Sequence, residues 1–238
     1  MAVKLDWQLK EGVATRWNFG VILIVLFSFP LVLRTTHALP TPAGKTGVLR
    51  FTIVVGVFLW TCFALAWIGI RKQGKVGPRD LMGMSWTHWK WIVRDLSISA
   101  LLLAAMAVIG NASNVWLAKF HGNSSGYRAV TAPQSLVEAS AFLLVALSAG
   151  FVEEFLFRGY LQRQFQAFCG NVPLASALQV LVFAQGHLYQ GVIRLVPVVL
   201  VGALLTGVAL WRRSLIPGMI AHGLGDSLVA LSFFARHI

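Results

Sequence analysis

Charged residues are scarce in this sequence. Only 12% of its 238 residues are Asp, Glu, Lys or Arg, and just 8 of them are acidic. An ordinary soluble domain carries about 25% charged residues, so roughly half of the usual charge is missing. A chain with so little charge cannot cover a folded surface with polar groups, nor does it have the polar composition of a disordered protein. The scarcity therefore excludes a water-soluble globular enzyme and an intrinsically disordered chain.

Cysteine is also scarce. The chain has 2 cysteines, Cys62 and Cys169, which are too few for a disulfide framework or a structural zinc site built from thiolates. Neither cysteine lies in a recognisable motif, so we expect no cysteine nucleophile. We interpret both as packing residues.

Apolar residues are abundant instead. They make up 57% of the chain, with 9 Trp and 16 Phe, and the mean hydropathy is +0.73. Seven apolar runs lie near the length of about 20 residues that a helix needs to cross a bilayer. They span residues 17–33, 49–70, 92–110, 136–157, 172–188, 192–211 and 215–234. A helix satisfies its own backbone in lipid. We therefore predict an all-α, polytopic transmembrane bundle of about seven (six to eight) helices, with residues 1–238 forming one integral membrane domain.

The net charge of +12 comes from basic residues that cluster between the apolar runs. They form no single stripe, so this pattern favours membrane topology over nucleic-acid binding, and the expected partner is the lipid bilayer. Counting Lys and Arg between the runs gives 13 on the side of the N-terminus and 7 on the other side. This excess predicts a cytoplasmic N-terminus. The compact length and the lack of an organelle-targeting segment favour a bacterial inner membrane.

Ionisable residues inside the apolar runs concentrate in the C-terminal half, and such residues are costly in lipid. They are Glu153, Glu154, Arg158, His187, His222 and Asp226. Glu154 and Arg158 have the i,i+4 spacing at which a carboxylate and a guanidinium meet. That pairing leaves Glu153 free to face the bundle interior as a general base. The alternative interpretation of these charged residues is that the helix ends at the lipid headgroups, where charged side chains are normal.

Phe183 and His187 also have i,i+4 spacing. Glu153 lies 15 residues before Phe168, and His187 lies 14 residues after Pro173, so each stretch of helix is about 21–22 Å long. Because the residues between are turn-like, an antiparallel hairpin would bring His187 level with Glu153, provided that the fourth helix continues past Phe157. Taken alone, His187 also fits an interfacial or packing histidine.

His222 and Asp226 share one face of the last apolar run. A simple up-and-down order of helices places His222 nearer the other membrane face than His187. A tilted or broken helix, or a short sixth span, would be needed to bring the two histidines together.

These three motifs resemble those of the CAAX-prenyl endopeptidase and Abi family of membrane proteases, also called the CPBP family. Its pattern is Glu-Glu-x-x-x-Arg, then Phe-x-x-x-His, then His-x-x-x-Asn or Asp. Here the first motif reads Glu153-Glu154-Phe155-Leu156-Phe157-Arg158, and the second and third run from 183 to 187 and from 222 to 226. The resemblance covers roughly residues 135–235, which form the protease-like motif core. The first 130 residues match only as generic membrane helices.

The resemblance implies an intramembrane endopeptidase that cuts a membrane-associated protein or peptide near its C-terminus. By this analogy Glu153 and His187 activate the attacking water. His222 and Asp226 position or stabilise the oxyanion, while Glu154 and Arg158 support the site. An ionised Asp226 cannot donate a hydrogen bond to an oxyanion, so we expect it to orient His222.

Two alternatives stay open. We expect no cofactor and no metal, but Glu153, His187 and His222 are chemically a plausible His₂Glu zinc set. The sequence has no His-Glu-x-x-His motif to support that set. The alternative function is a non-catalytic protein of the same fold that binds a membrane peptide, or acts as an immunity or scaffold factor.

Overall fold

The computed structural model describes residues 12–38, 47–83, 86–121 and 133–235, and within these ranges every regular element is a helix. The N-terminal half contains α1 (Arg16–Thr35), α2 (Gly47–Gln73), the short α3 (Pro78–Met82) and α4 (Trp89–His121). The C-terminal half contains α6 (Leu136–Glu153), the π-helical segment η1 (Glu154–Leu161), α7 (Gln162–Cys169), α8 (Val172–Gln185), η2 (Leu188–Gln190), η3 (Val192–Arg194), α9 (Leu195–Arg212) and α10 (Ile216–Phe234).

The predicted all-α membrane bundle is confirmed, because each of the seven apolar runs coincides with a helix. In the part of the chain that the structure describes, five helical stretches are long and apolar enough to cross a membrane: Arg16–Thr35, Gly47–Gln73, Trp89–Lys119, Leu136–Cys169 and Val192–Arg212. The apolar α8 is shorter, and α10 has 19 residues. The protein is therefore an integral membrane protein.

Two of these helices continue more than ten residues beyond the predicted ends of their apolar runs. The third run was expected to end at residue 110, but α4 continues to His121, because Val115 and Leu117 maintain its apolar content. The fourth run continues without interruption through η1 and α7 to Cys169. This second extension is the one that the predicted hairpin requires.

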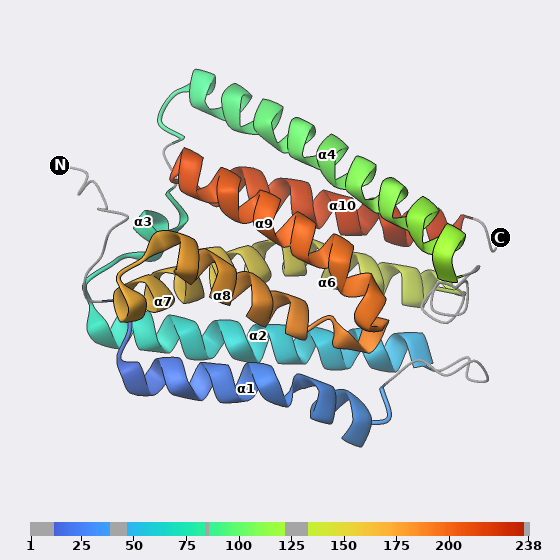
Figure 1. The fold of residues 1–238 in the computed structure, drawn as a ribbon, viewed down its shortest axis with the longest axis horizontal. Coiled ribbons are helices and arrows are strands. Elements are labelled where there is room, and N and C mark those ends of the chain that lie inside the picture. Colours follow the sequence, from blue (N-terminus) through green and yellow to red (C-terminus); the bar gives the residue numbers. More distant parts are fainter. Residues whose placement is uncertain (1–11, 39–46, 84–85, 122–132, 236–238) are drawn as a thin grey trace.

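The helices lie roughly along one common direction, with α6, η1 and α7 forming a continuous central rod (Figure 1). Helices α2 and α10 both pack against α6, while α1 packs on α2 and α4 packs on α9 and α10. The largest apolar core surrounds η1, whose Phe155, Leu156 and Tyr160 are completely buried against α1, α2 and α8. The central rod therefore carries the first motif through the middle of the molecule.

A tight turn connects α7 to α8. Gly170 adopts the left-handed conformation (φ 66°) that ends α7, and the side chain of Asn171 accepts a hydrogen bond of 2.8 Å from the backbone of Leu174 to start α8. Pro173 follows in the first turn of α8, where its fixed φ suits a helix start. The turn therefore reverses the chain within a few residues, as the sequence predicted.

The acidic residue at the start of the third run has buried partners. Asp95 accepts hydrogen bonds from Nη2 of Arg212 at 2.6 Å and from the indole of Trp86 at 3.1 Å. Its side chain is only 2% exposed. This contact joins α4 to the end of α9 and explains how a carboxylate is tolerated in an otherwise apolar helix.

Candidate active site

The first motif lies where α6 passes into η1. Every residue of η1 is buried, and π-helical turns occur frequently at functional sites. Nη1 of Arg158 donates to Oε1 of Glu154 at 2.9 Å, and neither side chain has any exposed surface. The predicted pairing of Glu154 with Arg158 is therefore confirmed. The ion pair with Arg158 involves the second carboxylate of the motif, that of Glu154, and does not include Glu153.

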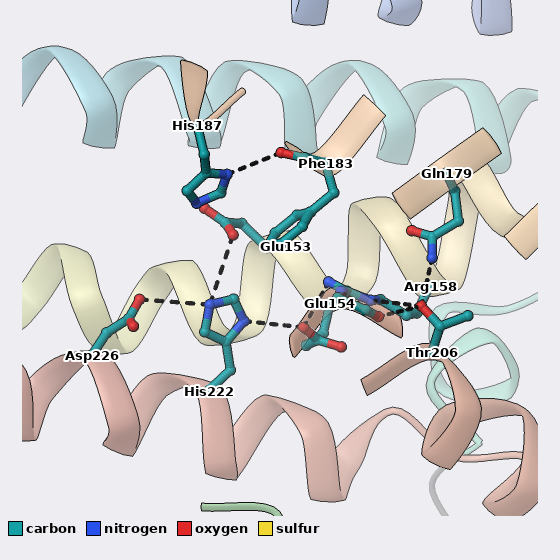
Figure 2. Close-up of polar contacts among 10 residues, drawn as sticks. Glu153, Glu154, Arg158, Gln179, Phe183, His187, Thr206, His222 and Asp226 are labelled. Atoms are coloured by element: carbon teal, nitrogen blue, oxygen red, sulfur yellow. Dashed lines mark hydrogen bonds and ion pairs between the residues drawn. The ribbon is translucent and has the colours of Figure 1, made fainter. Parts of the chain in front are cut away.

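Three carboxylates surround His222 (Figure 2). Its Nδ1 donates to Oε1 of Glu154 at 3.0 Å. Its Nε2 lies 3.8 Å from Oε2 of Glu153 and 3.5 Å from Oδ2 of Asp226. The hydrogen bond that orients the ring is therefore the one that Glu154 accepts from Nδ1, whereas Asp226 lies near the other ring nitrogen, Nε2. The side chain of Asp226 is also 46% exposed, the most accessible of the three carboxylates.

The helical hairpin places His187 beside Glu153 (Figure 2). His187 follows α8, and its Nδ1 donates to the carbonyl oxygen of Phe183 at 2.9 Å. Because Nδ1 carries the proton of that bond, Nε2 of a neutral ring is left as a proton acceptor. The side chains of Glu153 and His187 line one cavity, as the hairpin geometry predicted.

The simple up-and-down order of helices, which would separate His222 from His187, does not apply, because both histidine rings pack on Phe183. Gly202 of α9 lies level with Phe183, since its carbonyl oxygen accepts from Arg158 at 3.1 Å and a Cβ on it would touch the Phe183 ring. Measured along the common helix direction, the first residues of α9, Leu195 to Val201, therefore lie farther out than Phe183, past the end of α8. Only about 15 Å of helix remains from Gly202 to the end of α9 at Arg212. His222, about 9 Å into α10, is consequently brought back to the level of the first motif.

Phe183 contacts three of the motif residues. Its ring lies under the guanidinium of Arg158 at 4.5 Å, a cation–π arrangement. The ring centroids of His187 and His222 lie 4.7 Å and 6.3 Å from it. The aromatic residue of the second motif therefore packs the site together rather than supplying a reacting group.

Three polar groups that the sequence analysis missed hold Arg158 from the far side. Besides its bond to the Gly202 carbonyl, Arg158 donates from Nε to the hydroxyl of Thr206 at 3.4 Å. Gln179 donates to the same hydroxyl, which in turn donates to the Gly202 carbonyl at 2.7 Å. All of these groups are buried. The polar Gln179 inside an apolar run was the one signal that would have indicated this network.

The cavity shared by Glu153 and His187 has a volume of about 60 Å³. Its other walls are mostly apolar and come from α1, α2, η1, α8 and η2. They comprise Leu26, Phe29, Val55, Phe58, Leu59, Phe157, Val182, Phe183, Gln185, Gly186 and Tyr189. Oε2 of Glu153 and Oε1 of Gln185 are buried and have no hydrogen-bond partner among the described residues. The cavity is therefore lined mostly by apolar side chains, and two of its lining residues carry unpaired acceptor oxygens.

The alternative zinc set does not form a ligand cluster. In the described ranges, no three His, Cys, Asp or Glu residues are arranged so that they would hold a metal ion. Both ring nitrogens of His222 face carboxylates.

The chain was compared with models of known protein families. Residues 135–228 match the family described as Rce1-like, type II CAAX prenyl endopeptidase Rce1-like. The matched segment contains all three motifs and excludes α1, α2 and α4. Comparison with curated proteins and with solved structures gave no match. Residues 135–228 are thus similar to the Rce1-like family of type II CAAX prenyl endopeptidases, which supports the family that the motifs predicted.

Proposed function

We propose that the protein hydrolyses a peptide bond of a membrane-associated protein or peptide, near its C-terminus, with a water activated by Glu153 and His187. The observation that carries this proposal is that both side chains line one largely apolar cavity. A carboxylate and an imidazole with an unprotonated nitrogen are the groups that proteins use as general bases. The family match supports the protease class.

In the proposed reaction, a water between the two side chains gives a proton to Glu153. The water oxygen then adds to the carbonyl carbon of the substrate, and the carbonyl oxygen becomes an oxyanion. When the intermediate collapses, the C–N bond breaks and the proton held by Glu153 passes to the leaving nitrogen. His187 orients the water through Nε2, because its Nδ1 is held by the Phe183 carbonyl.

His222 is assigned to the oxyanion. In this scheme His222 acts as an imidazolium, in which both ring nitrogens donate. Nδ1 is occupied by Glu154, so Nε2 is the donor that faces Glu153 and the reacting carbonyl. In this scheme Asp226 helps to keep the ring charged, since a carboxylate at 3.5 Å from Nε2 stabilises the cation. Glu154 and Arg158 are positioning residues that hold the ring in place.

We also infer that the N-terminus is cytoplasmic and that the membrane is a bacterial inner membrane. The basic-residue count supports the orientation, although Arg158 and Arg163 are buried and so do not act as loop charges. Without them the count is still 11 against 7. Lys4, Lys10, Lys45, Arg128 and Arg236, which enter this count, lie outside the described residues.

The orientation is tested with single cysteines in a Cys62→Ala, Cys169→Ser background. On intact spheroplasts, a membrane-impermeant maleimide should label Val192→Cys, which replaces a side chain 73% exposed. It should label Lys75→Cys only after lysis. Labelling in the opposite order would reverse the orientation.

The catalytic proposal is tested by comparing wild type with Glu153→Gln on a quenched peptide library, with and without a strong chelator. General base catalysis contributes about 10²–10⁴-fold, so Glu153→Gln should reduce kcat by at least about 100-fold. Glu138→Gln is the matched control, because Glu138 begins the same helix, where it accepts from the backbone of Gln134 at 2.8 Å. It should leave kcat unchanged.

Each result separates the mechanisms. Cleavage that is lost in Glu153→Gln and survives chelation supports a metal-independent glutamate mechanism. Cleavage abolished by the chelator and restored by Zn²⁺ would assign the site to zinc. Equal activity of wild type and Glu153→Gln would contradict the role of Glu153, and capture of a peptide partner by both without cleavage would favour the binding function.

A further inference from the structure

The cavity that contains Glu153 and His187 is smaller than a segment of peptide. An apolar cavity of about 150 Å³ accommodates benzene, and this one measures about 60 Å³. Reacting atoms must approach one another to about 3–3.5 Å, so the carbonyl group of a substrate has to come next to Glu153. One wall of the cavity must therefore move before a peptide bond reaches the proposed water.

The walls differ in how firmly they are held. Most of the lining residues belong to α1, α2, the central rod or α8, and these helices pack on one another around the largest apolar core. The exception is the chain between α8 and α9, which supplies Gly186, His187 and Tyr189. Its only regular elements are the 3₁₀ turns η2 and η3, and neither contains a buried residue. Because few buried contacts restrain it, this connection is the wall that moves most easily.

Tyr189 is the side chain with which η2 closes the cavity. Its ring contacts Phe51 of α2 and Phe29 of α1, with the ring centroids 5.3 Å and 6.1 Å away. The ring also stacks on His187, with a centroid distance of 6.3 Å and an angle of 24° between the planes. Tyr189 therefore joins the proposed catalytic histidine to the two N-terminal helices.

Glycines lie on both sides of η2. Gly186 ends α8, and Gly191 separates η2 from η3. Gly191 has φ 97° and ψ 146°, a backbone conformation that residues other than glycine rarely adopt. A Cβ on Gly191 would meet nothing within 4 Å, so its neighbours leave room for it to move. Residues of this kind, at the ends of short elements, act as hinges.

We propose that η2 is a gate to the cavity and that Tyr189 is its plug. In the closed position Tyr189 packs on Phe29 and Phe51 and covers His187. In the open position η2 turns about Gly186 and Gly191, and the substrate chain enters beside Glu153. The inference rests on the proposed peptidase function and adds to it an opening step that precedes cleavage.

A reversible cross-link tests the gate. In a Cys62→Ala, Cys169→Ser background, Phe51→Cys and Tyr189→Cys are joined by a short bis-methanethiosulfonate reagent, which dithiothreitol removes. Because few cross-linked molecules can open, kcat/KM on quenched peptides should fall by at least about 10-fold and recover after reduction. Phe19→Cys with Phe165→Cys is the matched control. These two rings lie 5.1 Å apart between α1 and α7, and neither lines the cavity, so this cross-link should leave kcat/KM unchanged.

A second readout measures access to the cavity without catalysis. Diethyl pyrocarbonate modifies unprotonated imidazole nitrogens, and mass spectrometry locates the modified residues. In the protein with Phe51→Cys and Tyr189→Cys, modification of His187 should be slow while the cross-link is present and faster after reduction. The exposed His88, near the start of α4, is the internal control and should react equally in both states.

Gly191→Ala shifts the gate without a cross-link. Alanine is strained at φ 97°, so the variant should disfavour the closed position and speed the modification of His187 by about fivefold or more. Gly20→Ala is the matched control, because Gly20 lies within α1 and a Cβ there would meet nothing within 4 Å. It should leave the rate of modification unchanged.

The two readouts distinguish the gate from the proposed function. Slower modification of His187 together with lost cleavage, both reversed by dithiothreitol, would support the gate. Unchanged modification of His187 in the cross-linked protein would overturn it, and so would failure of the two cysteines to cross-link. Cleavage that the cross-link does not affect would overturn the gate and leave the peptidase function standing. Modification that responds to the cross-link, in a protein whose wild type cleaves no peptide, would support the gate and overturn hydrolysis.

Discussion

Nδ1 of His222 donates to Oε1 of Glu154 over 3.0 Å, although the two residues are 68 positions apart in the chain. The same oxygen accepts from Arg158 at 2.9 Å. Glu154 is therefore held between two donors from different helices and is not available as a base. The adjacent Glu153 faces the cavity instead, so the two consecutive carboxylates of the motif have separate tasks.

The ion pair between Glu154 and Arg158 should be strongly coupled. Removing one partner of a buried pair costs about 3–5 kcal/mol, because the other charge is left without compensation. We expect Glu154→Gln and Arg158→Met each to lower Tm in detergent sharply, and the double variant to be less destabilised than the sum of the two. A double-mutant cycle on the free energy of unfolding measures this coupling. Additive effects would contradict it.

The hydroxyl of Thr206 should matter for catalysis through Arg158. Thr206→Val keeps the shape of the side chain but removes the acceptor for Arg158 and Gln179. Because hydrogen bonds to charged groups contribute about 1.5–3 kcal/mol, we expect kcat to fall by about 10-fold or more, with little change in KM. Thr206→Ser, which retains the hydroxyl, should restore most of kcat. An equal loss in both variants would indicate a packing role only.

Much of the fold follows from local features of the sequence. The apolar runs predicted the helices because only helices satisfy the backbone in lipid over such lengths. The i,i+4 spacing predicted the pairing of Glu154 with Arg158, and Gly170 and Asn171 predicted the turn that brings His187 beside Glu153. These inferences succeeded because each depends on residues close together in the chain.

Other features depend on how helices are offset along one another, and the sequence does not encode these offsets locally. The level of His222 is set by how far α9 extends beyond Phe183, which no motif indicates. The role of Thr206 was hidden because a hydroxyl in an apolar helix ordinarily bonds its own backbone, as Thr206 also does. The contribution of Phe29 and Phe58 to the cavity wall could not be predicted, because they belong to no motif and the apolar runs contain many similar residues.

The contact between Asp95 and Arg212 should support stability rather than catalysis. Asp95→Asn leaves the charge of Arg212, whose side chain is 13% exposed, with a weaker partner at the junction of α4 and α9. We expect a loss of a few kcal/mol of stability, at most about 3–5 kcal/mol, and a lower Tm. Peptidase activity well below the transition should persist. Asp80→Asn, at an exposed position on α3, is the control and should leave Tm nearly unchanged.

The close approach of α6 and α10 should control the geometry of the site. A Cβ on Gly150 would lie 2.7 Å from the carbonyl oxygen of Met219 and would clash with the backbone of Gly223. In Gly150→Ala the two helices must therefore separate, which lengthens the contacts of His222 with Glu153 and Glu154. Such overpacking typically costs about 1–3 kcal/mol, so we expect a lower Tm together with reduced kcat.

Gly207→Ala provides the matched comparison for that variant. Gly207 lies in α9, and a Cβ there would meet nothing within 4 Å. Because alanine is favoured over glycine in a helix by about 0.5–1 kcal/mol, this variant should keep or slightly raise Tm and leave kcat unchanged. Equal Tm and kcat values for Gly150→Ala and Gly207→Ala would contradict the close packing of α10 on α6 at Gly223. A loss of kcat in Gly150→Ala alone would show that the separation of these two helices sets the position of His222.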